Sequence, residues 1–251
     1  MDMLIILAAA LVIGLALGLF GSGGSILTVP VLLYLMHLPQ AEAVASALGV
    51  VAIISFVALL PYLYRRQMPW SVLAQVALPG VAGAILGSWL SEFVAGYLQL
   101  SLLATLMLLS AINMWRQQIW HFPLKNGWPL WFAGAGLGIV TGLVGVGGGF
   151  LIVPMLLAVT SLSMSSAIAA SLMLVMLQSI AGFASHLWLL AQRGATVDMS
   201  TILLIGGVGA IGSIAALGLS AKLPQQLLRR MFALFVVALA VFILTQQWLQ
   251  Q

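Results

Sequence analysis

Hydrophobic residues run along this chain in long stretches that polar residues interrupt only briefly. The long stretches cover 3–20, 41–64, 70–90, 95–116, 127–144, 165–190, 198–219 and 225–248. Each is near the roughly 20 residues that cross a bilayer as a helix. Two shorter stretches, 25–36 and 149–160, stand apart. A helix of twelve residues rises only about 18 Å, which is too short for a hydrocarbon core about 30 Å thick. The pattern predicts an all-α polytopic membrane protein with two half-helices.

A glycine-rich segment occurs twice, and each copy leads into one of the short stretches. The first copy is Gly18-Leu-Phe-Gly-Ser-Gly-Gly-Ser-Ile-Leu-Thr-Val-Pro30-Val-Leu-Leu33. The second is Gly142-Leu-Val-Gly-Val-Gly-Gly-Gly-Phe-Leu-Ile-Val-Pro154-Met-Leu-Leu157, offset by 124 residues. Matched glycine and proline interruptions in two halves of a hydrophobic chain are typical of transporter binding sites. We therefore expect two membrane repeats, 1–118 and 127–251, joined by a cytoplasmic segment at 119–126 into one transport domain.

The order of long and short stretches predicts that these two repeats are inverted. In each repeat a helix is followed by a re-entrant half-helix and then by three transmembrane helices. If the first helix and its half-helix return to one side, three more spans leave an odd number of crossings. With the Arg65-Arg66 loop in the cytoplasm, only Arg193 of the eight basic residues lies outside, in keeping with the positive-inside rule. Both termini are then periplasmic, and the expected location is the bacterial inner membrane.

Composition excludes a soluble protein. The chain is 63% hydrophobic and 5% charged, whereas soluble domains carry about 25% charged residues. The net charge of +4 is carried by short loops next to the membrane, so we expect a lipid bilayer and no nucleic acid as partner. There is no cysteine, which rules out disulfides, thiol nucleophiles and cysteine metal sites. We expect neither a metal nor a cofactor, and the sequence leaves open whether two copies form a homodimer.

The doubled loop Gly-x-Gly-Gly followed by proline resembles the TauE/SafE family of sulfite and organosulfonate exporters, also called anion permeases of the toluene-sulfonate uptake type. Both Gly21-Ser-Gly-Gly…Pro30 and Gly145-Val-Gly-Gly-Gly…Pro154 fit it. The stretch from His186 to Asp198 is similar to the family's helix ending in the second half, which Arg65-Arg-Gln-Met-Pro-Trp70 does not match in the first. The resemblance implies a transporter of sulfite or of sulfonates such as sulfoacetate, acting in export.

The two loops are the expected anion site. Helices that begin inside the membrane present unpaired backbone N–H groups and the positive end of their dipole to an anion. Glycine allows the backbone to approach the ligand closely. The predicted substrate-binding residues of the loops are Gly21, Ser22, Gly23, Gly24, Ser25, Gly145, Gly147, Gly148 and Gly149. The alternative is that small residues serve helix packing, which we expect of Gly14, Gly83, Gly87, Gly209 and Gly212.

A polar stripe on the helix 165–190 is the second candidate. Helical spacing places Ser171, Gln178, Gly182, Ser185 and His186 within about a third of its circumference. Polar side chains in a bilayer usually face the protein interior, so we expect Ser171 and Gln178, with Ser46 of the first repeat, to contact the substrate. Hydrogen bonding between helices is an equally good reading. His186 is a candidate for proton coupling or a histidine at the membrane interface.

Alternating access of a small sulfur-containing anion is the predicted mechanism, with no catalytic residue. Two alternatives stay open on the sequence. One is an anion channel. The other is an intramembrane hydrolase in which Ser22 or Ser25 acts with His186. The repeat reduces this second alternative, because Val146 and Gly149 stand at the equivalent serine positions.

Overall fold

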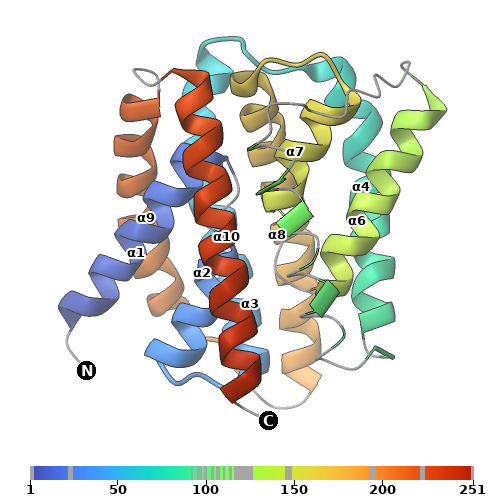
Figure 1. The fold of residues 1–251 in the computed structure, drawn as a ribbon. Helices are drawn as coiled ribbons and strands as arrows, with labels where there is room; N and C mark the ends of the chain where they lie inside the picture. The colour runs from blue at the N-terminus through green and yellow to red at the C-terminus, as the bar shows by residue number, and fades with distance from the viewer. Residues whose placement is uncertain are drawn as a thin grey trace.

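The computed structural model is a bundle of helices (Figure 1). It describes residues 3–21, 25–91, 93–94, 98, 101–102, 105, 108–109, 111–112, 115, 127–144, 149–192, 196–220 and 224–249. The first half holds α1 (Met3–Phe20), α2 (Ser25–Pro30), the π-helix η1 (Val31–Leu35), α3 (Gln40–Tyr64) and α4 (Trp70–Ser91). The second half holds α6 (Trp128–Val144), α7 (Gly149–Val159), α8 (Met164–Gln192), α9 (Met199–Ser220) and α10 (Gln225–Leu249). Within these ranges no strand is present.

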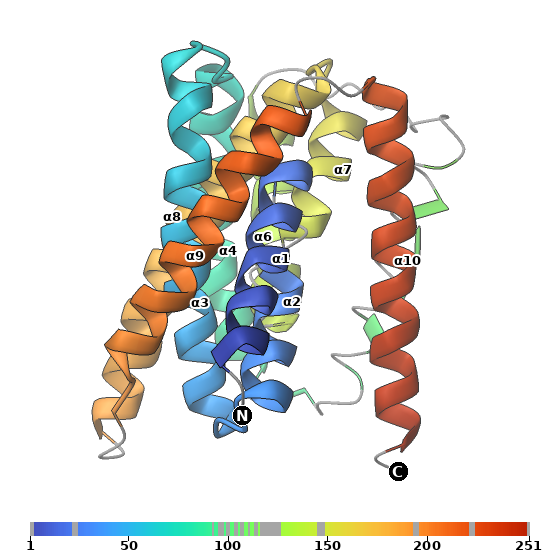
Figure 2. The ribbon, with the colours of Figure 1, turned by 90° about the vertical axis from the view of Figure 1, so that its left-hand side faces the viewer.

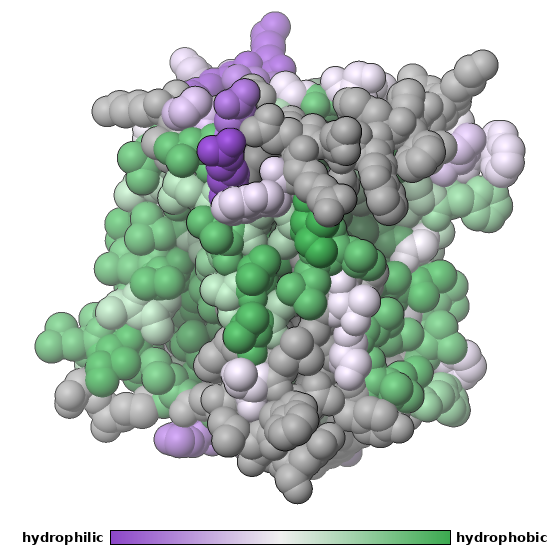
Figure 3. Space-filling view, in the orientation of Figure 1, coloured by the Kyte–Doolittle hydropathy of each residue, from purple (hydrophilic) through white to green (hydrophobic). Residues whose placement is uncertain are grey.

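The observed helices confirm the predicted all-α polytopic architecture. Five of the described helices are long and apolar enough to cross a membrane: Met3–Phe20, Ala41–Tyr64, Trp70–Gly87, Met164–Gln192 and Met199–Leu219. In the predicted span 95–116, the described residues from Leu98 onward are helical. Large hydrophobic side chains such as Leu78 and Ile211 are exposed on the outside of the bundle. Figure 3 shows hydrophobic residues over the middle of one face and hydrophilic residues at its upper end, as expected where lipid covers the middle.

Glycines bring two pairs of helices into backbone contact. α1 packs against α9, and α6 packs against α4. A Cβ atom at Gly14 would lie 1.8 Å from the carbonyl oxygen of Gly209, and one at Gly142 would lie 2.1 Å from that of Ala84. Close approach of helices through small residues is the usual way in which membrane helices associate. Approaches of 2.1 to 2.7 Å at Gly83, Gly87, Gly209 and Gly212 confirm that these glycines also serve packing, although the nearest neighbour at Gly209 is the Ile54 side chain of α3.

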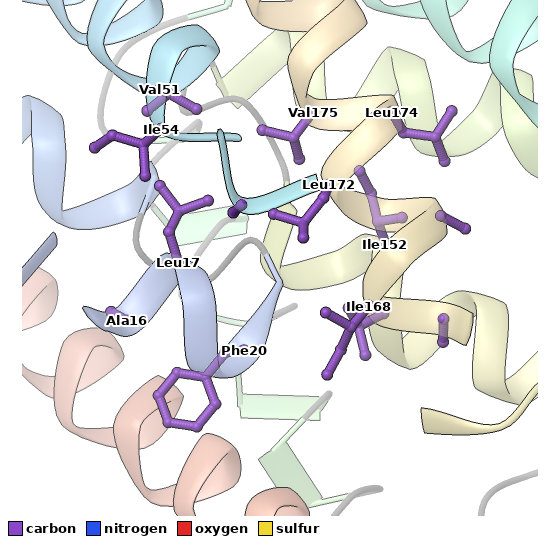
Figure 4. Close-up of a cluster of buried hydrophobic side chains, with 14 of the residues drawn as sticks. Ala16, Leu17, Phe20, Val51, Ile54, Ile152, Ile168, Leu172, Leu174 and Val175 are labelled. Carbon is purple, nitrogen blue, oxygen red and sulfur yellow. The ribbon is translucent and has the colours of Figure 1, made fainter. Parts of the chain in front are cut away.

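The third extensively packed pair, α3 with α8, occupies the centre of the bundle. The short helices α2 and α7 contact these central helices and also each other. Leu32, Ile152 and Leu156 of the short segments are fully buried. Figure 4 shows the cluster of apolar side chains that α1, α3 and α8 contribute around them. α10 stands at the side of the bundle, where Phe232 and Phe235 lie 5.3 Å from the Phe20 ring of α1.

The two short helices run in opposite directions. Both chain ends, and the connection from η1 to α3, lie at one end of the molecule (Figures 1 and 2). The connection from α7 to α8 lies at the other end. An inverted repeat would give these directions, and the inverted repeat itself stays a prediction. The division at 119–126 and the orientation of the repeats in the membrane stay predictions.

Candidate functional site

The duplicated glycine segments separate α1 from α2 and α6 from α7 along the chain. Six of the predicted site residues lie outside the described residues: Ser22, Gly23, Gly24, Gly145, Gly147 and Gly148. Gly149 is the first residue of α7, and Ser25 is the first residue of α2. Ser25 is 2% exposed, so the start of α2 lies inside the protein. Both predicted half-helices therefore begin at the duplicated glycine segments.

Gly21 joins the end of α1 to the central helix α8. Its φ of +78° lies in the left-handed region, which only glycine adopts without strain. Its N–H donates to Leu17 O at 2.8 Å, and its carbonyl oxygen lies 3.2 Å from the hydroxyl of Ser171. A Cβ atom at Gly21 would come within 2.8 Å of Ile168 Cγ2. Conformation and space both require glycine at the point where the first loop leaves its helix.

The two short segments differ after their proline. α7 continues as an α-helix through Pro154, whereas α2 ends at Pro30 and the chain goes on as the π-helix η1. Proline cannot donate a backbone hydrogen bond, and a π-helical turn often marks a functional region. The segment formed by α2 and η1 is therefore close to α7 in length and in its place in the chain, but its backbone hydrogen-bond pattern differs after the proline.

The polar stripe on α8 divides into an inner and an outer part. Ser171 is fully buried, and its hydroxyl lies 2.9 Å from Ile168 O as well as 3.2 Å from Gly21 O. Gln178 is 6% exposed, and neither its Nε2 nor its Oε1 has a partner among the described residues. Ser185 is exposed and donates to its own helix at Ala181 O. His186 is half-buried, with Nδ1 3.0 Å from Gly182 O.

Only the inner part of the stripe therefore lies where a substrate inside the bundle would meet it. Gln178 reaches the neighbouring helix pair, because a Cβ atom at Gly80 of α4 would lie 3.5 Å from its Nε2. Ser171 is placed beside the first glycine loop through Gly21. Ser185 and His186 bind carbonyls of their own helix, so their observed contacts are structural.

Sequence reasoning missed a pocket between the first turns of α3 and the residues where α9 begins. It has a volume of about 480 Å³ and is lined by Leu38, Glu42, Ser46, Thr196, Val197, Asp198, Met199, Ser200 and Thr201. Ser46, a predicted substrate contact, is 3% exposed and lines this pocket from α3. It is not shown in contact with Ser171 or Gln178. The match of Asp198 to the family's helix ending was the one sequence signal that pointed here.

Asp198 caps α9 in this pocket. Hydrogen bonds from the Ser200 hydroxyl, the Thr201 hydroxyl and the Ser200 backbone N–H lower the pKa of its carboxyl to about 2. The carboxylate is therefore ionised at neutral pH. These donors belong to the first turn of α9, so capping explains the arrangement. Among the described residues, no group of three His, Cys, Asp or Glu side chains could hold a metal ion.

Apolar helices long enough to span a membrane, with two short helices that begin at glycine-rich segments, define a polytopic membrane protein. The chain belongs to the TauE/SafE sulfite exporter family, because the family model described as "Sulfite exporter TauE/SafE" matches residues 6–243. It is 30% identical over 252 residues to the "Probable membrane transporter protein" of Xylella fastidiosa strain Temecula1, covering 94% of this chain and 92% of that protein. The protein of the same name from strain 9a5c matches to the same extent. No solved structure matches significantly. The protein is a multi-pass membrane transporter and not an enzyme.

Proposed function

We propose that this protein exports small sulfur-containing anions, namely sulfite and sulfonates such as sulfoacetate, by alternating access. The observation that carries the proposal is the arrangement of α2 and α7. Both begin at the duplicated glycine segments, both carry buried side chains, and they contact each other within the bundle. The family to which the chain belongs supports the substrate class through its description as a sulfite exporter.

Backbone N–H groups of the two glycine loops would hold the anion. The first N–H groups of a helix have no partner within it, and the helix dipole adds a positive end at the same place. No lysine or arginine occurs within the predicted apolar spans apart from their ends. Neutral donors bind the anion without a fixed positive charge beside it. The anion can therefore dissociate again, as transport by a carrier requires. The buried Ser171 and Gln178 add a hydroxyl and an amide on α8.

An inverted repeat supplies two related halves that could move against each other. The pairing of α1 with α9 has its counterpart in the pairing of α6 with α4, and α3 packs against its own counterpart α8. A two-fold relation between the halves would produce these three pairings. Many secondary transporters use such halves, with the substrate held where broken helices meet.

Export requires no coupled ion. The membrane potential is worth roughly 2.3 kcal/mol per elementary charge per 100 mV and expels an anion from a negative interior. Proton coupling through His186 is therefore unnecessary for export. If the protein instead took up the anion against the membrane potential, His186 would be the candidate for carrying a coupled proton. The hydrolase alternative has no support, because the family and the similar proteins are transporters.

The substrate and mechanism can be tested in proteoliposomes. We expect sulfite and sulfoacetate to raise the melting temperature of the purified protein and to cross the membrane in a saturable way, with acetate inert. An opposing concentration of unlabelled substrate should accelerate tracer exchange, because a carrier returns faster when loaded. Saturable flux without this acceleration would identify the anion channel instead. No flux of either sulfur anion above empty liposomes would contradict the proposed substrate class.

The proposed orientation can be tested separately, because the chain has no cysteine of its own. Cysteines introduced at Asp2 and Gln250 should react with an impermeant thiol reagent added to spheroplasts, whose inner membrane is intact. A cysteine at Arg66 should react only after permeabilisation, since that loop is expected in the cytoplasm. The reverse pattern would invert the proposed orientation, and termini on opposite sides would contradict the inverted repeat.

A further inference from the structure

Four buried side-chain atoms lack a hydrogen-bond partner among the described residues, and all four lie on α3 and α8. They are Ser55 Oγ, Ser179 Oγ and both amide atoms of Gln178. The two serines are fully buried. They are also 124 residues apart, which is the offset of the duplicated glycine segments. Ser55 and Ser179 therefore occupy the same position in the two repeats.

Several other buried hydroxyls donate to a carbonyl oxygen of their own helix. Ser213 donates to Ala210 O at 2.8 Å, and Thr141 donates to Gly138 O at 2.9 Å. Such a bond is open to any helical serine. An unpaired buried hydroxyl costs free energy, because it has lost its hydrogen bonds to water. It is therefore informative that two equivalent serines both lack a partner among the residues that the structure describes.

The helix faces that carry the two serines meet at the centre of the molecule. A Cβ atom at Gly182 of α8 would lie 3.1 Å from the Leu48 side chain of α3. Ser55 follows Leu48 by two helical turns and shares its face, while Ser179 precedes Gly182 by about one turn. α3 and α8 run in opposite directions (Figures 1 and 2). Counting from the Leu48 contact, the two serines lie within about 6 Å of each other along the helix axes.

The surroundings of this pair are apolar. Ile54 precedes Ser55 in the chain, and Val175 lies one helical turn before Ser179. Both belong to the apolar cluster of Figure 4 and are fully buried. Gln178 adjoins Ser179 in the chain, but its amide reaches toward α4 at Gly80. Hydroxyl donors without a charged partner suit an oxyanion that must be held briefly and then released, since transport sites must bind weakly enough to let the ion leave.

We propose that Ser55 and Ser179 form a second binding position for the transported anion at the interface of α3 and α8, separate from the glycine loops. An inverted repeat would relate the two serines by its two-fold axis, and each would face the anion in one of the two orientations of the carrier. The sulfur oxyanion as ligand rests on the proposed function. The placement of the position rests on the unpaired atoms alone.

Cysteine labelling tests the position without knowledge of the substrate. Ser55→Cys and Ser179→Cys are compared with Ser213→Cys, whose parent serine is equally buried but paired. The probes are the methanethiosulfonate reagents that carry ethylsulfonate, an anion, or ethylammonium, a cation. We expect the anionic reagent to modify both cysteines at least tenfold faster than Cys at Ser213, and faster than the cationic reagent does. Labelling no faster than at Ser213 overturns the proposal.

Alanine variants supply the second measurement. Ser55→Ala and Ser179→Ala should leave the melting temperature equal or higher, because each removes an unpaired buried hydroxyl, yet lower kcat/KM for sulfoacetate about tenfold. Unchanged transport by the stable alanine variants also overturns the proposal. If the wild-type protein moves neither sulfite nor sulfoacetate while both cysteines still react selectively with the anionic reagent, the second position stands and the proposed substrate falls.

Discussion

Valine at Gly24 or at Gly148 should abolish binding of sulfite and sulfoacetate. Each glycine is proposed to let backbone N–H groups contact the anion, and a branched side chain at either position would hold the anion away. The two positions are 124 residues apart, so loss at both would show that the loops act on one ligand. Binding is measured by the ligand-dependent rise in melting temperature and transport by flux in proteoliposomes. We expect at least a hundredfold loss of affinity in each variant.

Folding must be controlled in this experiment, because valine in place of glycine can destabilise a protein as well as block a ligand, for example by about 1–3 kcal/mol wherever the backbone needs a positive φ. Gly136→Val is the matched control, since a Cβ atom at Gly136 has no neighbour within 4 Å. Its flux should equal that of the wild type. A folded Gly24 or Gly148 variant that binds with unchanged affinity would assign that loop to packing. Tolerance in only one loop would direct attention to the difference between Ser25 and Gly149.

Alanine at Gly142 should prevent α6 from docking on α4. The added Cβ would lie 2.1 Å from Ala84 O and 2.8 Å from the carbonyl carbon of Ala84, and backbone atoms cannot rotate away as a side chain can. The helices must separate by about 1 Å, at or beyond the upper end of the usual 1–3 kcal/mol cost of overpacking. We expect a sharp fall in the yield of monodisperse protein in detergent and in its melting temperature.

The control for Gly142→Ala lies on the same helix. Gly136 is exposed, and alanine there meets nothing. Because alanine is favoured over glycine in a helix by up to about 1 kcal/mol, Gly136→Ala should leave the melting temperature unchanged or higher. Equal stability of the Gly142 and Gly136 variants would show that the observed close approach does not hold the bundle together.

The helices were predictable from the sequence because a membrane span requires a continuous run of apolar residues, which is a local property of the chain. A span needs about 20 apolar residues, so hydropathy alone predicted 3–20, which the structure shows as Met3–Phe20, and 25–36, which appears as α2 followed by η1. The π-helical turn after Pro30 was not predicted. The equivalent proline of the second repeat, Pro154, lies inside a regular α-helix, so the proline by itself does not produce the turn.

Part of the candidate site followed from the repeat and part did not. The repeat singled out the glycine loops, and helical spacing selected Ser171 and Gln178, which the structure shows buried on α8. Helical spacing also included Ser185, which is exposed. Helical spacing from Ser46 does not select Ser55, which lies on the opposite face of the same helix, yet α3 packs against both α8 and α9. The offset of 124 residues would have paired it with Ser179.

The sequence by itself determined which segments enter the membrane, where they break and which family they belong to, because apolar length and glycine-proline interruptions are properties of neighbouring residues. Only the tertiary structure decided which helices meet: α1 with α9, α4 with α6 and α3 with α8. It also decided which buried polar atoms find no partner in the described part of the chain, the hydroxyls of Ser55 and Ser179 among them. Helix pairing and hydrogen-bond satisfaction depend on residues far apart in the chain, and in a bilayer every apolar face is equally compatible with lipid. Hydrophobicity therefore places a helix in the membrane, and close packing chooses its partner.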